Sequence, residues 1–434
     1  MTANAIAATA DPGGEEQARA LDASDPLPTR RTEFLIPRHH EREVVYLAGN
    51  SLGLQPRSTQ SRLLAELRDW ATLGVDGHTE AERPWIAYHE HLREPAARLV
   101  GAQPEEVVVM NSLTVNLHLM MVSFYRPTAE RYQIVIEDTA FPSDSYAVRS
   151  QAAFHGFDPD AAVVRLRPRD GEDALRTDDV VAFLEREGHR VALVLLGGVN
   201  YYSGELLDIE AITTATRTAG AVAAWDLAHA AGNVELHLHD WNVDWAAWCS
   251  YKYLNSGPGS LAGVFVHERH LTDRSLPKLA GWWSTEPSSR FAMGPVVTPV
   301  DTVDSWQVSN PPIFAMAPVL VALEMFDEVG MSALRSKSQR LTTFLQAQLD
   351  AIAAGRPFTT ISPRDPAQRG AQLSIRILDR PAGVVCDALR RDHDVIADAR
   401  QPDVVRFAPT PMYNTFHDCW RAAVALAAVM DARA

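Results

Sequence analysis

Short apolar runs alternate with longer segments of helical periodicity through the middle of the chain. Six runs are predicted as buried strands, namely Val107–Met110, Ile134–Ile136, Val163–Val164, Val191–Leu196, Ala221–Trp225 and Trp245–Cys249. Continuous apolar strands separated by helices are typical of a parallel or mostly parallel sheet that helices cover on both faces. The pattern therefore predicts an α/β fold for this part of the chain.

The start of the chain has a different pattern. The first thirty or so residues mix Ala, Asp, Pro and Gly without periodicity, which is typical of a mobile tail or arm. Order is predicted to begin near Val44–Leu47. A helix is predicted after Pro56, and its apolar face consists of Leu63, Leu64, Leu67 and Trp70.

The C-terminal third combines helices and strands in a mixed order. One long helix is predicted from Ala317 to about Asp350. The elements predicted after it are Gln372–Ile377, the helix Ala382–Arg391, Val395–Asp398, Val404–Phe407 and the helix His417–Met430. This order indicates a smaller α+β domain. The predicted division is an N-terminal tail or arm at 1–44, a large domain at 45–316, and a linker helix with a small domain at 317–434.

Composition narrows the class of protein. The chain has 434 residues, of which 46% are hydrophobic and 22% charged, so it can bury a sizeable core. A net charge of −15 argues against nucleic-acid or anionic-membrane partners. Three cysteines without CxxC spacing exclude a disulfide framework and a cysteine zinc site. No apolar run is long enough to cross a bilayer and no signal peptide is evident, so we expect a cytoplasmic protein.

Unusual side chains follow four of the predicted strands. Ligands bind at the carboxyl ends of the strands in such sheets, so residues directly after a strand are candidates for a site. Asn111–Thr114 opens a helix after the first strand and offers free amides to an anion, although plain helix capping is an alternative. Phe141 follows the second strand and could stack on a planar ligand or belong to the core.

An acid and a lysine follow two later strands. Asp226, with His229 three residues on, could hold a protonated ring nitrogen or cap a helix. Lys252 is a candidate for a Schiff base, since desolvation frees its amine, and the alternative is a lysine that snorkels to the surface. Gly257, Gly259 and Gly263 are interpreted as allowing a ligand to approach the backbone.

Together these residues supply what pyridoxal 5′-phosphate needs, which is a phosphate site, a ring stack, a pyridinium partner and an imine-forming lysine. The sequence contains neither GxGxxG nor GxxxxGK[ST], so no nucleotide motif competes. His237, His239 and Asp240 alternate but lack further ligands nearby in sequence, so no metal is predicted.

Several longer stretches of the chain match a known pattern. They are Leu47–Gly53 (LAGNSLG), Gly77–His78, Arg83–Trp85, Asn111–His118 (NSLTVNLH), Phe141–Asp144 (FPSD), Asp226–Ala230 (DLAHA), Cys249–Asn255 (CSYKYLN), Gly281–Trp283, Val308–Ile313 (VSNPPI) and Val405–Asn414 (VRFAPTPMYN). In these stretches the sequence resembles the kynureninase family, fold-type-I pyridoxal-phosphate enzymes of the aspartate aminotransferase superfamily. The stretches extend over almost the whole chain from residue 45 to 420. The resemblance implies a mostly parallel seven-stranded sheet between helices, followed by a smaller α+β domain.

The resemblance also implies roles for individual residues. Lys252 would form the imine with pyridoxal 5′-phosphate, Asp226 would pair with the pyridine nitrogen with His229 beside it, and Tyr251 would bind phosphate or relay a proton. The other implied cofactor contacts are Leu113, Thr114, Phe141, Ser143, Asp144, Trp282 and Asn310. The implied substrate contacts are Ser51, His78, Asn310 and Arg406, and Trp282 and Asn310 would come partly from the second subunit of a homodimer.

The implied reaction is the hydrolysis of L-kynurenine or a ring-substituted relative to an anthranilate and L-alanine, in catabolic or biosynthetic kynurenine metabolism. Two positions depart from the family pattern. Gly197 stands where a hydroxyl residue is common, and Ser284–Thr285 replaces a Gly-His pair near the substrate ring. Alternatives are another reaction on the same fold, such as cysteine desulfuration or amino transfer, and a non-catalytic pyridoxal-phosphate-binding regulator.

Overall fold

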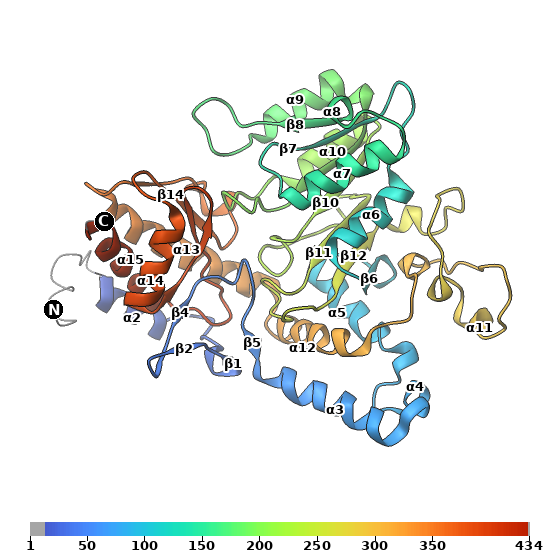
Figure 1. Ribbon diagram of the computed structural model, residues 1–434, viewed down its shortest axis with the longest axis horizontal. Coiled ribbons are helices and arrows are strands. Elements are labelled where there is room, and N and C mark those ends of the chain that lie inside the picture. Colours follow the sequence, from blue (N-terminus) through green and yellow to red (C-terminus); the bar gives the residue numbers. More distant parts are fainter. Residues whose placement is uncertain (1–13, 433–434) are drawn as a thin grey trace.

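A seven-stranded mixed sheet forms the centre of the larger half of the molecule, as the computed structural model of residues 14–432 shows (Figure 1). Its strands are β6 (Val107–Met110), β7 (Gln133–Glu137), β8 (Val163–Leu166), β9 (Val191–Gly197), β10 (Val222–Asp226), β11 (Trp245–Cys249) and β12 (Ala262–Val266). Their order is β6-β12-β11-β10-β9-β7-β8, and only β12 runs antiparallel to its neighbours. The predicted mostly parallel seven-stranded sheet is confirmed.

Helices cover both faces of this sheet. Side chains of a strand alternate between faces, so Val107 and Val109 enter one core while Val108 and Met110 enter another. The first core includes residues of α5 (Glu90–Val100), α9 (Thr177–Glu187), α10 (Ile209–Thr218) and α12 (Ile313–Val329). The second includes residues of α6 (Leu113–Phe124) and α7 (Pro142–Phe154). All the strand ends that carry candidate chemistry therefore lie between two helical layers.

Strand β12 was not predicted from the sequence. Its glycine, Gly263, lies against the Trp248 indole, which a Cβ atom at that position would overlap. Gly257 and Gly259 lie in the preceding loop with φ values of 86° and 80°. The interpretation as a ligand approach was therefore wrong for Gly263, which packs against a tryptophan, and it stays a prediction for Gly257 and Gly259, whose positive φ values place them in a turn with no atom within 4 Å of an added Cβ.

A second, smaller sheet lies in the C-terminal part of the chain, at the left of Figure 1. It has the order β13-β14-β17-β16 and is antiparallel throughout. Its strands and the helices of this half are β13 (Phe358–Thr360), β14 (Leu373–Ile377), β16 (Asp398–Arg400), β17 (Val404–Phe407), α13 (Met331–Ala353), α14 (Ala382–His393) and α15 (Phe416–Asp431). The predicted smaller α+β unit is present.

The N-terminal segment packs on this smaller half. Helix α2 (Gly14–Ala23) contacts α15, and the Asp22 carboxylate accepts hydrogen bonds from the amides of Phe416 and His417 at 2.7 and 3.0 Å. Strand β4 (Val45–Tyr46) pairs with β15 (Val395–Ile396). The mobile-tail prediction was therefore wrong for residues 14–23, because a helix N-terminus and an acidic side chain attach them; residues 1–13 lie outside the described residues.

Helices α12 and α13 replace the predicted single helix from Ala317 to Asp350. The chain breaks at Gly330, whose φ of 83° suits glycine and ends a right-handed helix. Helix α12 packs on α5 and on α3 (Arg57–Leu73), whereas α13 packs on α15. The domain boundary at residue 317 stays a prediction, and this packing favours a boundary at Gly330 instead.

Short strand pairs and single-turn helices lie outside the two larger sheets. Two small hairpin-like pairs are formed by β1 (Phe34–Leu35) with β5 (Gln55–Pro56) and by β2 (Arg38–His39) with β3 (Arg42–Glu43). Single-turn helices are α4 (Gly77–Glu80), α8 (Pro159–Ala162) and α11 (Pro287–Arg290). Within residues 14–432, no helix is both long and apolar enough to cross a membrane.

The Gly263–Trp248 contact makes a prediction about stability. Gly263→Ala should lower the free energy of unfolding by about 1–3 kcal/mol, because the added methyl group has no room beside the indole. Gly383→Ala is the matched control, since no atom lies within 4 Å of the added Cβ at that helical position. Urea unfolding of both variants tests the prediction, and equal midpoints would contradict it.

Candidate active site

A cavity of about 300 Å³ lies at the carboxyl ends of the parallel strands. It brings together ten of the residues singled out in the sequence, and these are Ser51, Leu113, Thr114, Phe141, Ser143, Asp144, Asp226, His229, Tyr251 and Lys252. Lining residues that were not predicted as site residues include Glu137, Asn200, Tyr201 and Arg400. The sheet topology thus gathers side chains from segments far apart in sequence, as expected at such an edge.

Lys252 projects into this cavity three residues after strand β11. Its Nζ lies 3.0 Å from Nε2 of His229. Burial and the positive charges of Lys252, Arg406 and Arg400 hold the pKa of His229 well below its usual value. His229 is therefore neutral and accepts a hydrogen bond from the lysine, and its Nδ1 has no hydrogen-bond partner among the described residues.

Asp226 and Asp144 form a buried pair of carboxyl groups. Asp226 ends β10 and accepts a hydrogen bond from the Ala228 amide at 2.8 Å, while Asp144 belongs to the first turn of α7. Burial raises the pKa of both groups, and the neighbouring Asp226 charge raises the pKa of Asp144 further. Asp144 is consequently the protonated partner and donates a hydrogen bond to Asp226.

Two helix N-termini open into the cavity. Helix α6 begins at Leu113 and presents free backbone amides, whereas α7 begins at Pro142, which has no N–H, and its Asp144 amide donates to the Phe141 carbonyl at 3.0 Å. Both helices direct the positive end of a helix dipole at the cavity. The hydroxyls of Thr114 and Ser143 lie 2.8 Å apart and link the two helices. Hydroxyls and amides in this arrangement suit a phosphate group.

Glu137 is a further acid in the cavity that sequence reasoning missed. It is the last residue of β7 and accepts hydrogen bonds from the Gly197 amide at 2.9 Å and from Asn200 Nδ2 at 2.6 Å. A Cβ at Gly197 would lie 2.9 Å from a Glu137 oxygen. Gly197, one of the departures from the family pattern, thus lets the backbone approach this carboxylate. Glu137 was missed because it closes an apolar strand with no motif around it.

Aromatic groups lie at one side of the cavity. The Phe141 ring is 47% exposed and meets the Tyr201 ring edge-on, with centroids 5.2 Å apart. Burial raises the pKa of Tyr251, which lines the cavity beside Lys252, so its hydroxyl stays protonated. Phe141 is therefore available to a planar ligand, which the alternative of a core phenylalanine would not allow.

Arg406 lies behind the cavity wall. Its side chain is fully buried, and its Nη2 donates to Asp398 at 2.6 Å and to the Ser51 hydroxyl at 3.1 Å. Its Nη1 donates to the Tyr201 carbonyl at 2.6 Å. Ser51 itself lines the cavity, so the guanidinium reaches the edge of the site through that hydroxyl.

Three other predicted contacts lie away from the cavity of their own chain. His78 is exposed and meets Trp85 edge-on, Trp282 is 45% exposed, and Asn310 is exposed. Ser284 bonds within its own loop, accepting from the Gly281 amide and donating to the Gln307 carbonyl. These positions stay predictions, and a single chain does not bring them together with Lys252.

Comparison with known proteins identifies the family. Residues 45–377 match the aminotransferase class-V family, and residues 334–426 match the kynureninase C-terminal domain. A kynureninase of Salinispora tropica is 63% identical over 96% of this chain and 97% of its own length. One from Myxococcus xanthus is 54% identical over 94% of this chain and 95% of its own. The chain belongs to the kynureninase family.

Solved structures show that this family member shares its fold with more distant enzymes. The cysteine desulfurase CsdA from Escherichia coli superposes with a TM-score of 0.75 at 18% identity, covering 92% of this chain and 97% of that one. The cystine C–S lyase C-DES gives a TM-score of 0.74 at 17% identity, with coverages of 89% and 97%. At these identities the likeness concerns the fold alone, and the predicted fold-type-I class is confirmed.

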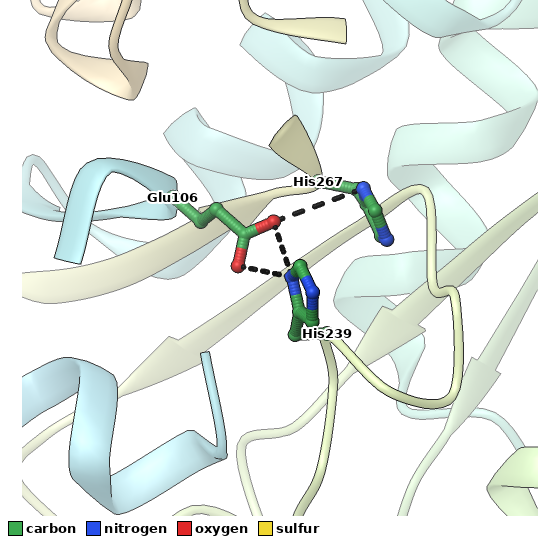
Figure 2. A group of neighbouring side chains, drawn as sticks. All are labelled: Glu106, His239 and His267. Carbon is green, nitrogen blue, oxygen red and sulfur yellow. Dashed lines mark hydrogen bonds and ion pairs between the residues drawn. The ribbon is translucent and has the colours of Figure 1, made fainter. Parts of the chain in front are cut away.

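A separate cluster of Glu106, His239 and His267 lies elsewhere in this kynureninase-family chain (Figure 2). His239 Nδ1 lies 3.0 Å from both Glu106 oxygens, and those oxygens also accept the amides of Glu268 and Gln103 at 2.7 and 2.8 Å. The His267 Nδ1 accepts the Arg269 amide at 3.3 Å. The Glu106 oxygens and the Nδ1 atoms of both histidines thus already form hydrogen bonds within the protein. The cluster connects the turn before β6 to the loop after β12.

The acid pair makes a prediction about pH. Because the pKa of Asp144 is raised in the fold, the folded chain keeps a proton that the unfolded chain loses above about pH 4, and stability therefore falls as pH rises. Asp144→Asn removes that cost, so its stability relative to the unsubstituted chain should grow between pH 5 and 8, reaching about 1–3 kcal/mol.

Urea unfolding of cofactor-free protein across this pH range measures the effect. Asp138→Asn is the control. It makes the same substitution at an aspartate directly after β7, but Asp138 is partly exposed and pairs with Arg167. A parallel pH dependence in Asp144→Asn and the unsubstituted chain would show that Asp144 holds no proton.

Proposed function

We propose that this chain is a pyridoxal-phosphate-dependent hydrolase that cleaves L-kynurenine, or a ring-substituted kynurenine, to an anthranilate and L-alanine. The observation that carries the proposal is the cavity in which Lys252 faces a buried acid pair between two helix N-termini. The relatives support the choice of reaction, since the Salinispora tropica protein named kynureninase covers 96% of the chain.

The lining residues fit the cofactor. The buried Asp226–Asp144 pair has raised pKa values and gains a cationic partner if a protonated pyridine nitrogen binds there. Helices α6 and α7 with Thr114 and Ser143 suit its phosphate. Phe141 would cover the ring, and Lys252 would bond its aldehyde. A structure of the fold neighbour C-DES contains glycine covalently linked to this cofactor.

Each group at the site has a distinct task in the proposed reaction. Pyridoxal phosphate, when bound, supplies an electron-withdrawing ring that stabilises negative charge at the substrate α-carbon. The Lys252 amine takes the α-proton as general base. Asp226 keeps the ring nitrogen protonated, and neutral His229 accepts a hydrogen bond without adding positive charge beside Lys252. For the hydrolysis to balance, water adds to the substrate γ-carbonyl, the Cβ–Cγ bond breaks, and Cβ receives a proton to become the methyl group of L-alanine. The protonated Tyr251 hydroxyl donates to the phosphate or relays that proton.

Substrate recognition is assigned to groups on the smaller half of the molecule and on the partner subunit. Arg406 and Ser51 are proposed to bind the α-carboxylate, since a guanidinium presents a planar pair of donors. His78 and Asn310 are proposed to contact the substrate and Trp282 and Asn310 the cofactor, with Trp282 and Asn310 supplied partly by the partner subunit. Ser284 and Thr285 in place of Gly-His make the preference between kynurenine and 3-hydroxykynurenine the most informative specificity test.

The cysteines disfavour desulfuration. Cys249 and Cys419 are buried, and burial raises the pKa of Cys386 to about 12. A persulfide-forming cysteine needs an accessible thiolate. All three cysteines belong to the described part of the chain, and each is a buried or protonated thiol.

The enzyme is proposed to be a homodimer with shared sites. Leu64, Leu67 and Trp70 of α3 are 49%, 44% and 58% exposed, although their spacing is that of a buried helix face. Phe314 packs against Trp70 and is 43% exposed itself. A second copy of the chain would bury these groups in a two-fold interface.

The cofactor proposal is tested by Lys252→Ala. The chain has only three lysines, of which Lys337 is buried against Asp25 and Lys278 lies over the Trp306 ring. Protein reconstituted with pyridoxal phosphate should show a visible absorbance band and hydrolyse kynurenine. Lys252→Ala should lose the band and lower kcat by at least about a thousandfold, because the general base is removed.

Lys278→Ala is the control for this experiment. Burial lowers the pKa of Lys278 to about 8, so it is the competing reactive amine. Borohydride reduction followed by peptide mass spectrometry should place the cofactor on Lys252. A colourless, inactive unsubstituted enzyme after reconstitution, or label on Lys278 with full activity, would refute the assignment.

Shared sites predict complementation between inactive variants. Lys252→Ala and Asn310→Ala subunits should each be inactive as homodimers. If Asn310 acts across the interface, each heterodimer contains one intact site. The heterodimer should therefore regain up to about half of the activity of the unsubstituted homodimer. Purified heterodimers carrying two different tags are assayed for kynurenine hydrolysis, and verified heterodimers without activity would show that Asn310 serves its own chain.

A further inference from the structure

The smaller sheet places one acid and two arginines on the same face. Asp398 of β16 lies directly opposite Arg406 of β17 in the antiparallel register. Arg400 follows Asp398 by two residues, so its side chain leaves the strand on the same side. This face is turned toward the loop after β9, whose Tyr201 carbonyl accepts a hydrogen bond from Arg406.

These three side chains and Ser51 form one network. The Asp398 carboxylate accepts from Arg406 Nη2 at 2.6 Å and from Arg400 Nη1 at 2.8 Å. The Ser51 hydroxyl donates to Asp398 and accepts from both arginines, at 3.1 and 3.3 Å. One carboxylate thus balances two guanidinium groups, and the network carries one uncompensated positive charge.

The two arginines differ in their access to the cavity. The Arg406 side chain is 0% exposed, whereas that of Arg400 is 33% exposed and lines the cavity together with Ser51. The Nε atoms of both are buried, and neither has a hydrogen-bond partner within residues 14–432. A guanidinium at a cavity wall with unused donors and excess positive charge is suited to a carboxylate.

We propose that Arg400 is a substrate-binding residue that holds the α-carboxylate of the amino acid from the cavity side, with Arg406 behind it and Asp398 as the positioning residue for both. This inference rests on the proposed function for the identity of the amino acid. Asp398 holds both guanidinium groups in place before the substrate binds, which lowers the conformational entropy lost on binding. The alternative is that Arg400 serves only as an ion-pair partner of Asp398.

Binding of the product and its amide distinguishes the two roles. L-alanine carries the α-carboxylate and L-alaninamide lacks it, so the ratio of their Kd values for the cofactor-loaded enzyme reports on carboxylate recognition. Arg400→Gln should reduce the preference for L-alanine over L-alaninamide by about 10- to 100-fold, because a charge-assisted hydrogen bond is lost. KM for kynurenine should rise by a similar factor, while kcat changes less. Calorimetry and steady-state kinetics measure these effects.

Arg376→Gln is the matched control. Arg376 lies on β14 of the same sheet and has a side chain that is 32% exposed. It forms an ion pair with Asp173, with an N–O distance of 2.8 Å, and neither residue lines the cavity. Its substitution should leave the L-alanine preference unchanged. Arg400→Lys should recover part of the preference, since an ammonium keeps the charge but not the planar fork, and this variant decides the question if Arg400→Gln does not fold.

The outcomes separate this inference from the proposed function. An Arg400→Gln enzyme that is destabilised but keeps the full L-alanine preference would overturn the binding role and leave Arg400 structural. Unchanged kynurenine hydrolysis in that variant would do the same while leaving the proposed function intact. If the unsubstituted enzyme fails to hydrolyse kynurenine but its L-alanine preference depends on Arg400, the result supports the carboxylate site and refutes the proposed substrate.

Discussion

Two carboxyl groups share one proton at the base of the active-site cavity, and the surrounding structure depends on that pair. Asp226 is held at the end of β10 by the sheet and by the Ala228 amide, and Asp144 by the first turn of α7. Their burial raises both pKa values, so the ligand-free pair is costly. A cationic ring nitrogen removes that cost, which couples cofactor binding to the stability of the strand ends and of α7.

Much of this arrangement was predictable because it follows from local sequence. The parallel strands are continuous apolar runs, and Leu113, Asp226 and Lys252 come directly after such runs or at the helix that follows. Elements that depend on a distant partner were missed. Strand β12 contains a glycine that packs against Trp248, and the acidic, alanine-rich α2 packs on α15. The break at Gly330 was overlooked because apolar periodicity continues on both sides of it.

The site shows the same distinction. Motif residues around the cofactor were found, since each lies in a short conspicuous stretch. Glu137 and Arg400 were not, because their importance arises from which elements face each other: β7 beside β9 in the first case, and β16 against the loop after β9 in the second. Arg406 was assigned from the family resemblance, and the structure adds that Asp398 and Ser51 share its guanidinium. Pairings between distant segments are set by tertiary packing and leave no pattern in a single sequence.

The scarcity of lysine has a chemical consequence for an enzyme that handles an aldehyde. Only three lysines occur in 434 residues; Lys337 is 1% exposed, and all other basic side chains apart from histidine are arginines. Guanidinium groups stay protonated at neutral pH and do not condense readily with aldehydes, whereas exposed ammonium groups exchange protons and react. The surface of this protein therefore offers few amines for adventitious carbonyl adducts. Among its lysines, an aldehyde cofactor added in excess would meet mainly Lys252 and Lys278, whose pKa is lowered to about 8, so Lys278 is the lysine where an unintended adduct is expected.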